Sequence, residues 1–412
     1  MADRAASYKG ALGKLWGGHL DPKLDSAPMV VSVFAGCGGS SLGYSAAGYR
    51  ELLAVEWDRR VCETFRVNFP GVPVHEGDIV KLSGTDALHL AKVKPGELDV
   101  LDGSPPCQGF SIAGKRRIGD VRNRLFEEYV RLLQAFQPKV FVMENVSGLV
   151  KGKMVLVFAE MTRMLKASGY RIRCKLLDAK WYGVPQSRKR LIWIGVRENL
   201  DMEPSHPIAQ TWPMAMGDAL PHLAKARSQR INPWIDKGRP VPTISGLSRG
   251  YSVCFSEPSP TIQRGGIGGA WMQQMLVEAG AGMLLSEEDM REAAIRPTWQ
   301  MHRVLSGKEA SKHFDLVRPD LSRPSPVVMG DAGGSGTEMV HPIEMRKLAI
   351  PEVKLLQSFP LEFRVLGNFH EKWAQLGNAV PPLMMLAIAE HIRQKILGKA
   401  KKEGEHGQAV QG

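Results

Sequence analysis

The feature that most constrains this chain is an alternation of short apolar runs with amphipathic stretches over its first 200 residues. The apolar runs are rich in Val, Ile and Leu and have the length of buried strands. The amphipathic stretches have the apolar spacing of helices with one buried face. Strand–helix alternation of this kind predicts an α/β fold with a doubly wound, mostly parallel sheet. The expected strands are 29–35, 51–57, 97–103, 139–145 and 190–196, and the expected helices are 58–69, 123–136 and 156–168.

The pattern changes after residue 197 and divides the chain into segments. Pro, Gly and Ser become frequent and the periodicity weakens, which predicts a second, irregular domain. Helical spacing returns near residue 344, and 382–397 has the pattern of a closing helix that begins at proline. The expected segments are an N-terminal extension (1–28), a core (29–197), the second domain (198–340), a return to the core (341–398) and a disordered tail (399–412).

Composition excludes several classes of protein. The 412 residues are 43% hydrophobic and 23% charged, which is a globular composition and not a disordered, collagenous or coiled-coil one. The chain contains no run of eighteen apolar residues and no apolar signal segment at its start, so we expect no membrane partner. Its five cysteines are widely spaced with no CxxC pair, which argues against a disulfide framework and against a metal site. We expect a protein of the reducing cytoplasm.

The net charge points to a polyanionic partner. Lys and Arg number 54 against 42 Asp and Glu, a formal net charge of +12. Nucleic acid is the first candidate for such a partner, although a basic solvated surface would give the same balance. The charge is also clustered, because nine basic residues and one acid, Asp178, lie between Arg163 and Arg190.

A glycine-rich turn follows the first expected strand. Gly36, Gly38 and Gly39 in FAGCGGSSLG (34–43) allow the backbone to turn tightly and to approach a ligand. Glu56 ends the next strand 20 residues after Gly36, where a carboxylate can hold ribose hydroxyls. The pair predicts a nucleoside-binding site. The simpler alternative is a glycine turn beside a surface acid, because Ser41 stands where a strict GxGxxG motif has its third glycine.

Two potentially reactive side chains follow later strands. Cys107 lies in a Pro-Pro loop directly after 97–103, which should expose its thiol at the carboxyl edge of the sheet. This favours a nucleophile, although a lone cysteine is more often a small buried hydrophobe. Glu144 ends the strand at 139–145, in a half-buried place that suits acid–base chemistry. A helix cap or an ion-pair partner is the alternative for Glu144.

A basic motif precedes the last expected strand. In YGVPQSRKR, alternation places Gln186, Arg188 and Arg190 on one face and Lys189 on the other. Planar guanidinium groups suit a phosphate or a base carbonyl. The alternative is a basic strand start at the surface.

Together these motifs resemble those of the cytosine-5 DNA methyltransferases that use S-adenosylmethionine, of prokaryotic or phage type. The resemblance covers about 29–197 and 322–390, and the matching blocks occur in the family's order. It implies a Rossmann-like methyltransferase core and a target-recognition domain within 198–340. The blocks are FAGCGG, GDI (77–79), SPPCQGFS, ENV (144–146), QSRKR (186–190), RPSP (323–326), RKLAIPEVKLLQSFP (346–360) and QLGNAVPP (375–382).

The resemblance implies a covalent mechanism. The Cys107 thiolate would attack carbon 6 of a cytosine flipped out of the duplex, while Glu144 hydrogen-bonds ring nitrogen 3 and the exocyclic amine. Arg188 and Arg190 would hold the cytosine carbonyl and neighbouring groups, with Arg190 the first choice for the carbonyl. Carbon 5 would take the methyl group of S-adenosylmethionine, a base would remove the carbon 5 proton, and Cys107 would be eliminated.

The resemblance also implies contacts to the methionine half of S-adenosylmethionine. Phe34, Gly36 and Gly38 would line this half of the cofactor. Pro105 would pack near the sulfonium, and Asn378 would return to the cofactor from the far end of the chain.

A second set of implied contacts involves the nucleoside half of the cofactor. Glu56 would bind the ribose, and Trp57 would stack near the adenine. Asp78 would contact the adenine amine, with Ile79 beside it in the same GDI block.

Some alternatives remain open at this point. PSPTIQRGGIGG (258–269) also resembles the block assigned to RPSP, which would shorten the recognition domain. A tRNA cytosine-5 methyltransferase shares the same core, although about 125 residues separate QSRKR from RPSP and favour double-stranded DNA. We expect a nucleoid-associated monomer. A separate cognate restriction endonuclease, as in a restriction-modification system, and an orphan or phage enzyme without one both fit the sequence.

Overall fold

The computed structural model describes residues 2–106, 124–152, 154–220, 319, 321–330 and 347–398. Cys107, most of the expected 198–340 domain and the 399–412 tail lie outside these ranges, so the division into segments stays a prediction. In the described part of the chain, no helix has both the length and the apolar character needed to cross a membrane.

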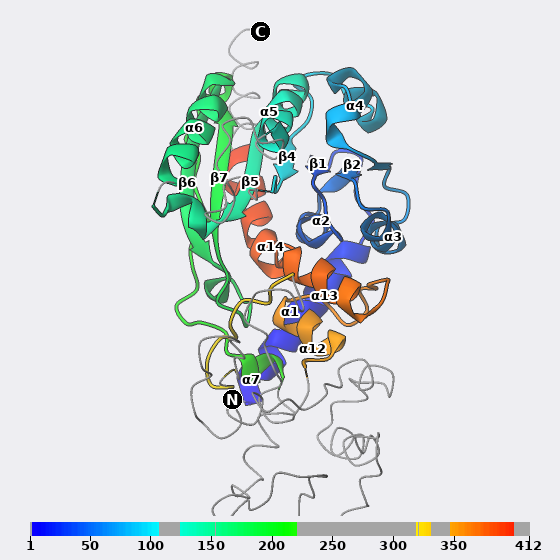
Figure 1. The fold of residues 1–412 in the computed structure, drawn as a ribbon, viewed down its shortest axis with the longest axis vertical. Helices are drawn as coiled ribbons and strands as arrows, with labels where there is room; N and C mark the ends of the chain where they lie inside the picture. Colours follow the sequence, from blue (N-terminus) through cyan, green and yellow to red (C-terminus); the bar gives the residue numbers. More distant parts are fainter. Residues whose placement is uncertain are drawn as a thin grey trace, which may run out of the picture.

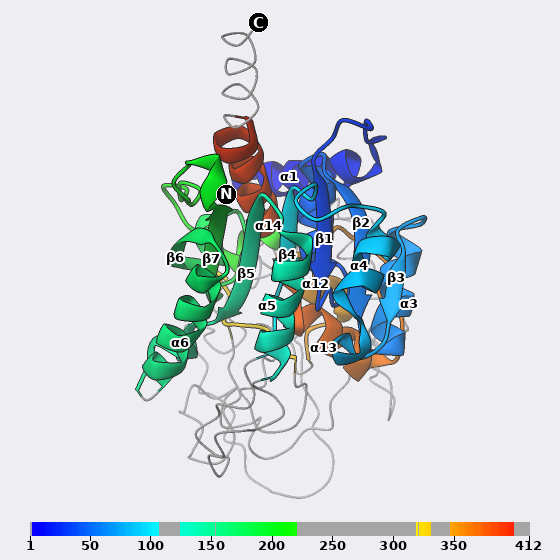
Figure 2. The ribbon, with the colours of Figure 1, turned by 90° about the horizontal axis from the view of Figure 1, so that it is seen from above.

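The core of the molecule is a seven-stranded sheet with the strand order β3–β2–β1–β4–β5–β7–β6 (Figure 2). Strands β1 to β5 pair in parallel, and β7 runs antiparallel to both of its neighbours. This confirms the predicted doubly wound, mostly parallel sheet. The strands are β1 (Met29–Val33), β2 (Arg50–Glu56), β3 (Val74–Glu76), β4 (Val100–Gly103), β5 (Val140–Val146), β6 (Tyr170–Asp178) and β7 (Lys189–Arg197).

Two of these strands, β3 and β6, were not predicted from the apolar pattern. Both lie at the edges of the sheet, where one face or one side meets water. In β6 the basic residues Arg171, Arg173 and Lys175 alternate with less polar ones, so the segment shows a basic run and not an apolar one. Edge strands often carry such charges, which discourage pairing with another chain.

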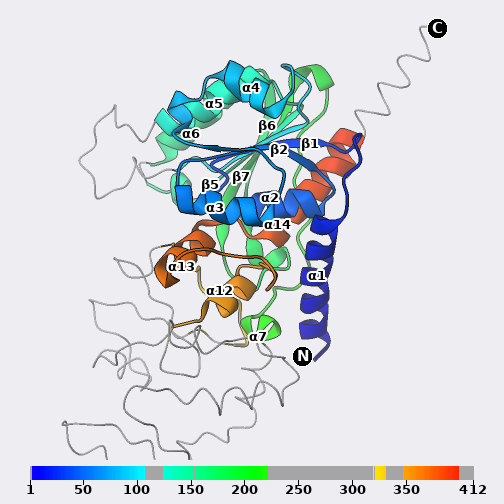
Figure 3. The same ribbon diagram turned by 90° about the vertical axis from the view of Figure 1, so that its right-hand side faces the viewer.

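Helices cover both faces of the sheet (Figure 3). Helices α2, α3 and α14 lie on one face, and α4, α5 and α6 lie on the other. The expected helices correspond to α3, α5, α6 and α14, whereas α1 and α4 were not predicted. The helices are α1 (Ala2–Leu20), α2 (Gly39–Ala46), α3 (Arg59–Asn68), α4 (Gly84–Ala91), α5 (Arg124–Phe136), α6 (Met154–Ala167), α7 (Met216–Ala219), α12 (Ile350–Leu356), α13 (Phe369–Asn378) and α14 (Pro382–His391), which continues as a π-helical segment, η6 (Ile392–Leu397).

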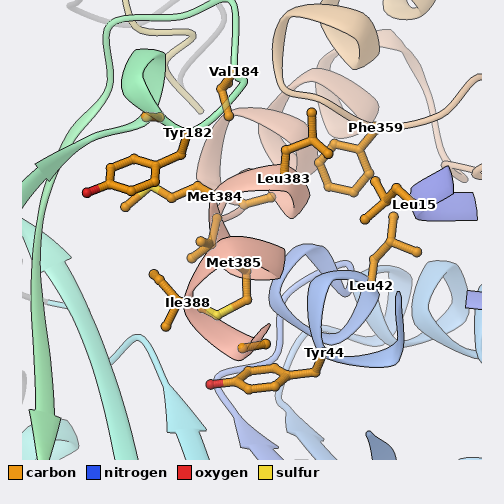
Figure 4. Close-up of a cluster of buried hydrophobic side chains, with 14 of the residues drawn as sticks. Leu15, Leu42, Tyr44, Tyr182, Val184, Phe359, Leu383, Met384, Met385 and Ile388 are labelled. Atoms are coloured by element: carbon orange, nitrogen blue, oxygen red, sulfur yellow. The ribbon is translucent and has the colours of Figure 1, made fainter. Parts of the chain in front are cut away.

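The C-terminal helix α14 packs directly on α2, near the start of the chain (Figures 1 and 4). Met384, Met385 and Ile388 of α14 are fully buried in the same cluster as Leu42. The helices approach so closely that a Cβ atom at Gly43 would lie 2.7 Å from Met385 Cβ and 2.9 Å from the Pro382 carbonyl oxygen. Residues near the two ends of the described chain are therefore in direct contact.

The N-terminal helix α1 joins α2 to the C-terminal segment. The Tyr8 hydroxyl donates to the Leu355 carbonyl. Near the other end of α1, the ring nitrogens of His19 lie 2.9 Å from Ser45 Oγ and 3.0 Å from the Asn68 carbonyl oxygen. Figure 3 shows α1 running from the α2 layer towards α7.

The contact at Gly43 gives a test of this packing. Gly43→Ala should lower the free energy of unfolding by about 1–3 kcal/mol, because the added methyl group overpacks the α2–α14 contact. Gly13→Ala is the matched control, since a Cβ there meets nothing within 4 Å and should stabilise α1 by about 0.5–1 kcal/mol. Urea unfolding measures both. Equal effects of the two substitutions would show that the helices are not in tight contact at Gly43.

Candidate active site

The site is organised by the point where the strand order reverses. From β1 the chain continues to β2 and β3 on one side, whereas β4 and β5 lie on the other. In open α/β sheets the loops at such a reversal diverge and leave a ligand-binding crevice at the carboxyl edge. The loop after β1 contains the glycine-rich turn, and the loop after β4 leads through Pro105 to Cys107.

The glycine-rich turn has a backbone that favours glycine at two positions. Gly36 and Gly38 have φ angles of 56° and 98°, in the left-handed region. A Cβ at Gly38 would lie 2.4 Å from the ring of Phe69, whereas a Cβ at Gly36 would meet nothing within 4 Å. Phe34 also has a positive φ, of 56°. The ring of Phe69 therefore packs against the turn at Gly38, whereas the space beside Gly36 is open to a ligand.

Glu56 holds this turn through hydrogen bonds to backbone amides, a role that the sequence did not predict; its predicted contact with ribose hydroxyls stays a prediction. Its Oε2 accepts from the Gly36 amide at 2.9 Å, and its Oε1 accepts from the amides of Trp57 and Asp58 at 2.9 and 3.1 Å. Burial raises the pKa of the Glu56 carboxyl, and these three amide donors oppose the rise. Glu56 is buried, with 9% of the residue exposed, whereas the neighbouring Trp57 is 77% exposed.

The next strand end brings Asp78 to the same edge. The Gly77 amide donates to the Glu56 carbonyl at 2.9 Å, which ties the GDI block to the end of β2. Asp78 is exposed and caps a short 3₁₀ turn, η1 (Ile79–Lys81), by accepting from the Val80 amide at 3.1 Å. Ile79 is buried beneath it. The structure therefore places the ends of β1, β2 and β3 side by side, as the nucleoside-site prediction requires.

Glu144 and Arg190 form an ion pair across the β5–β7 ladder. The distance from Arg190 Nε to Glu144 Oε1 is 2.6 Å, and the two side chains are only 14% and 10% exposed. Register pairs Val146 with Arg190, so the arginine stands beside the carboxyl end of β5. The ion pair that the sequence left as an alternative for Glu144 is thus present, at the edge that also carries the glycine turn.

Arg188 lies in a different environment from Arg190. Its guanidinium is 2% exposed and donates to the carbonyls of Gly377 at 2.9 Å and of Val328 and Asn378 at 3.4 Å. Burial lowers the pKa of Arg188, the charge of Arg190 lowers it further, and Glu144 opposes both. Lys189 is exposed, in agreement with the predicted alternation. Whether Arg188 also contacts the cytosine stays a prediction.

The loop that leads to Cys107 is held by a residue that we did not single out from the sequence. Asn145 Nδ2 donates to the carbonyl of the buried Pro105 at 3.1 Å. Its Oδ1 accepts from the Val146 amide at 2.8 Å. The sequence signal that could have identified Asn145 is its position as a polar residue at the end of an apolar strand, next to Glu144.

The segment 321–330 connects the QSRKR motif to the C-terminal return. The Ser187 amide donates to the Ser325 carbonyl, and the Ser325 amide donates to the Pro185 carbonyl, both at 2.9 Å. At its end, Gly330 lies against the exposed Asn378, because a Cβ there would be 2.0 Å from Asn378 Oδ1. RPSP (323–326) thus lies beside QSRKR, whereas the competing block 258–269 lies outside the described residues.

A metal centre is not formed by the described parts of the chain, since no three His, Cys, Asp or Glu side chains gather there. The positions that can hold an organic cofactor are the open turn at Gly36, the Glu56 carboxyl, the exposed Trp57 ring and Asp78.

Known proteins resemble the chain along most of its length. Residues 29–394 match the family model described as C-5 cytosine-specific DNA methylase. The Type II methyltransferase M1.HphI of Haemophilus parahaemolyticus is 34% identical over 88% of this chain and 86% of its own length. M.XorII of Xanthomonas oryzae pv. oryzae, also named a Type II methyltransferase, is 30% identical over 92% of this chain and 87% of its own.

Solved structures share the fold. One is described as a DNA modification methyltransferase encoded within a prophage (E. coli), with a TM-score of 0.60, 23% identity, and coverage of 89% of this chain and 99% of that one. A mutant of Spodoptera frugiperda DNMT2 has a TM-score of 0.56 and 16% identity over 89% of this chain and 99% of its own.

The contacts of Arg188 give a prediction about stability. Arg188→Met should lower the free energy of unfolding by about 3 kcal/mol, because the buried carbonyls of Val328, Gly377 and Asn378 lose a donor. Lys189→Met, at the exposed neighbour, should change it by less than about 0.5 kcal/mol. Urea unfolding of both variants is the measurement. A fully stable Arg188→Met protein would mean that these hydrogen bonds do not hold the C-terminal return.

Proposed function

We propose that this chain methylates cytosine through a covalent Cys107 intermediate, with S-adenosylmethionine as methyl donor. The chain belongs to the C-5 cytosine-specific DNA methylase family and methylates carbon 5 of cytosine in a specific DNA sequence. The observation that carries this proposal is the Glu144–Arg190 ion pair of 2.6 Å at the carboxyl end of β5. The pair adjoins Asn145, which holds the loop leading to Cys107 through its bond to Pro105.

The residues around the glycine turn fit S-adenosylmethionine. Glu56 Oε2 accepts one amide proton from Gly36 and keeps a lone pair for a ribose hydroxyl. The exposed Trp57 ring offers a stacking surface for the adenine, and Asp78 offers an acceptor for its amine. Ile79, buried below, would support the adenine end.

The methionine half would lie on the open side of the turn. There Gly36 leaves free space, and Phe34 and Gly38 flank it with positive φ angles. Pro105 and Asn378 would close the far side. When bound, S-adenosylmethionine supplies an electrophilic methyl group on a sulfonium.

The chain's own residues would activate the cytosine. The Cys107 thiolate adds to carbon 6, and the electron pair displaced from the 5,6 double bond makes carbon 5 nucleophilic. Glu144 hydrogen-bonds ring nitrogen 3 and the exocyclic amine, and Arg190 holds both the carboxyl of Glu144 and the cytosine carbonyl. After carbon 5 has taken the methyl group, a base removes its proton, the double bond re-forms, and the Cys107 thiolate leaves.

Arg188 would act in this scheme mainly through position. Its bonds to Gly377 and Asn378 fix the end of α13 near the crevice. Arg190 is therefore our assignment for the carbonyl contact.

We infer that the substrate is double-stranded DNA from which the target base is flipped out, because a stacked cytosine cannot reach Cys107. The net charge of +12 and the Type II names of the relatives support DNA over the tRNA alternative. The same names support a separate restriction endonuclease as the biological counterpart. We infer a monomer that works at the nucleoid in the cytoplasm.

The nucleophile is tested by Cys107→Ser. The variant should give no detectable methylation while it binds S-adenosylmethionine as the parent protein does, since Cys107 bonds to cytosine and not to the cofactor. Bisulfite sequencing of DNA and tRNA from cells that express each protein is the measurement. Methylated cytosines in the variant's DNA would refute the Cys107 assignment, and methylation confined to tRNA would replace DNA as the substrate.

The cofactor site is tested by Glu56→Gln. The amide loses the charge that accepts the Gly36 and Trp57 amides and the ribose, so the Kd for S-adenosylmethionine should rise about 10–100-fold. Glu63→Gln is the control, because Glu63 pairs with Arg59 on the exposed surface of α3 and should leave the Kd unchanged. Isothermal titration measures both. Equal affinities would place the ribose elsewhere.

A further inference from the structure

Two acids with buried carboxyl groups lie between the sheet and α2. Asp102 is in β4, at the strand end that leads to Pro105, and only 3% of it is exposed. The Tyr44 hydroxyl of α2 donates to Asp102 Oδ1 at 3.3 Å, and Ser40 of α2 faces the same carboxyl. Asp102 thus connects the strand of the nucleophile loop to the helix of the glycine turn.

The second acid, Glu51, approaches the same helix from β2. Both of its carboxyl oxygens are buried and have no hydrogen bond of standard geometry to any described residue. The hydroxyls of Ser32 in β1 and Ser41 in α2 flank it, and Ser41 Oγ lies 3.4 Å from Ser32 Oγ. Register places Ser32 beside Asp102, so the two acids occupy neighbouring parts of one buried polar layer.

The surroundings of this layer disfavour negative charge. Burial raises the pKa of Asp102 to about 7 and that of Glu51 to about 8. The charge of Glu144 on β5 raises the first further, and Asp102 raises the second, while the flanking hydroxyls oppose both rises. Tyr44 on α2 and Tyr129 on α5 are the other ionisable groups that face Asp102, and both are neutral far above pH 7.

Within the described residues, neither acid has a Lys or Arg at ion-pair distance, in contrast to Glu144 and to Asp99, which pairs with Lys139 at 2.8 Å. A layer with two carboxyl groups and no compensating cation is stable when the groups carry their protons.

We propose that Asp102 and Glu51 are positioning residues that, in their protonated form, hold the glycine turn against the loop to Cys107, so that ionisation of the pair in alkaline solution weakens cofactor binding. Two negative charges in this layer repel each other and draw in water, which displaces α2 because α2 covers the layer. A shift of α2 carries the turn at Gly36 with it. The inference rests on the proposed function in that S-adenosylmethionine is the ligand of the turn.

The same groups set a pH dependence of stability. In the unfolded chain both acids ionise near pH 4, so the unfolded state releases their protons at lower pH than the folded state does. The free energy of unfolding should therefore fall as the pH rises from about 4 to about 8 and then level off.

Asp102→Asn tests the proposal because the amide keeps the size and neutrality of the protonated acid. The Kd of the parent protein for S-adenosylmethionine, titrated from pH 6 to pH 9, should rise at least about tenfold above pH 7. Asp102→Asn should bind within about threefold of the parent at pH 6 and lose most of that rise, and Glu51→Gln should behave alike. Asp99→Asn, at the amino end of the same strand, is the control and should keep the parent's alkaline loss.

A parent protein with pH-independent affinity, or an Asp102→Asn variant with the full alkaline loss, would overturn the proposal. Urea unfolding from pH 5 to pH 9 gives a readout without ligand, in which Asp102→Asn should flatten the parent's decline. If neither the parent protein nor any variant binds S-adenosylmethionine at any pH, the proposed cofactor is wrong. The urea unfolding series then tests the two acids alone. If the free energy of unfolding declines with pH in Asp102→Asn and in Glu51→Gln as it does in the parent, the proposed role of the acids is refuted. If Asp102→Asn does not fold, Glu51→Gln supplies both readouts.

Discussion

The site depends on one steric condition, the contact of α2 with α14 across Gly39 and Gly43. A Cβ at Gly39 would lie 2.3 Å from the Val380 carbonyl oxygen, so the chain just before α14 rests on the backbone of α2 itself. Because α2 begins at the glycine turn and α14 follows α13, this contact brings the end of α13 to the carboxyl edge of the sheet. The bonds from Arg188 to Gly377 and Asn378 hold the same end of α13 from the other side.

The two arginines of the QSRKR motif make different contacts, although they are only two residues apart. Arg190 lies in β7 and meets the carboxylate of Glu144 on β5. Arg188 lies just before β7 and meets Gly377 and Asn378, the last residues of α13. Carbonyls at a helix C-terminus lack partners within the helix and attract cations, so a buried guanidinium satisfies them.

Sequence patterns predicted those parts of the structure that depend on local periodicity and short spacing. The parallel sheet, the helices α3, α5, α6 and α14, and the position of Glu56 at the end of β2 all follow from such patterns. The bonds of Arg188 do not, because their acceptors lie about 140 and 190 residues further along the chain. The sequence also did not predict that the carboxyl groups of Asp102 and Glu51 are buried. An acid near a strand end is ordinarily solvated, and only the packing of α2 against the sheet removes these two from water.

The closure of the fold by its two ends has a consequence for synthesis. Tyr8 bonds to Leu355 and the Cys37 thiol donates to the Gln375 carbonyl, contacts that span 347 and 338 residues. A ribosome adds about 5–20 residues per second, so for tens of seconds the nascent glycine turn exists without the segment that buries its helix. Contacts of such long range form late. The apolar face of α2 must therefore be protected from other chains until translation has ended, and a prematurely terminated chain would carry the first motifs of the enzyme without a finished site.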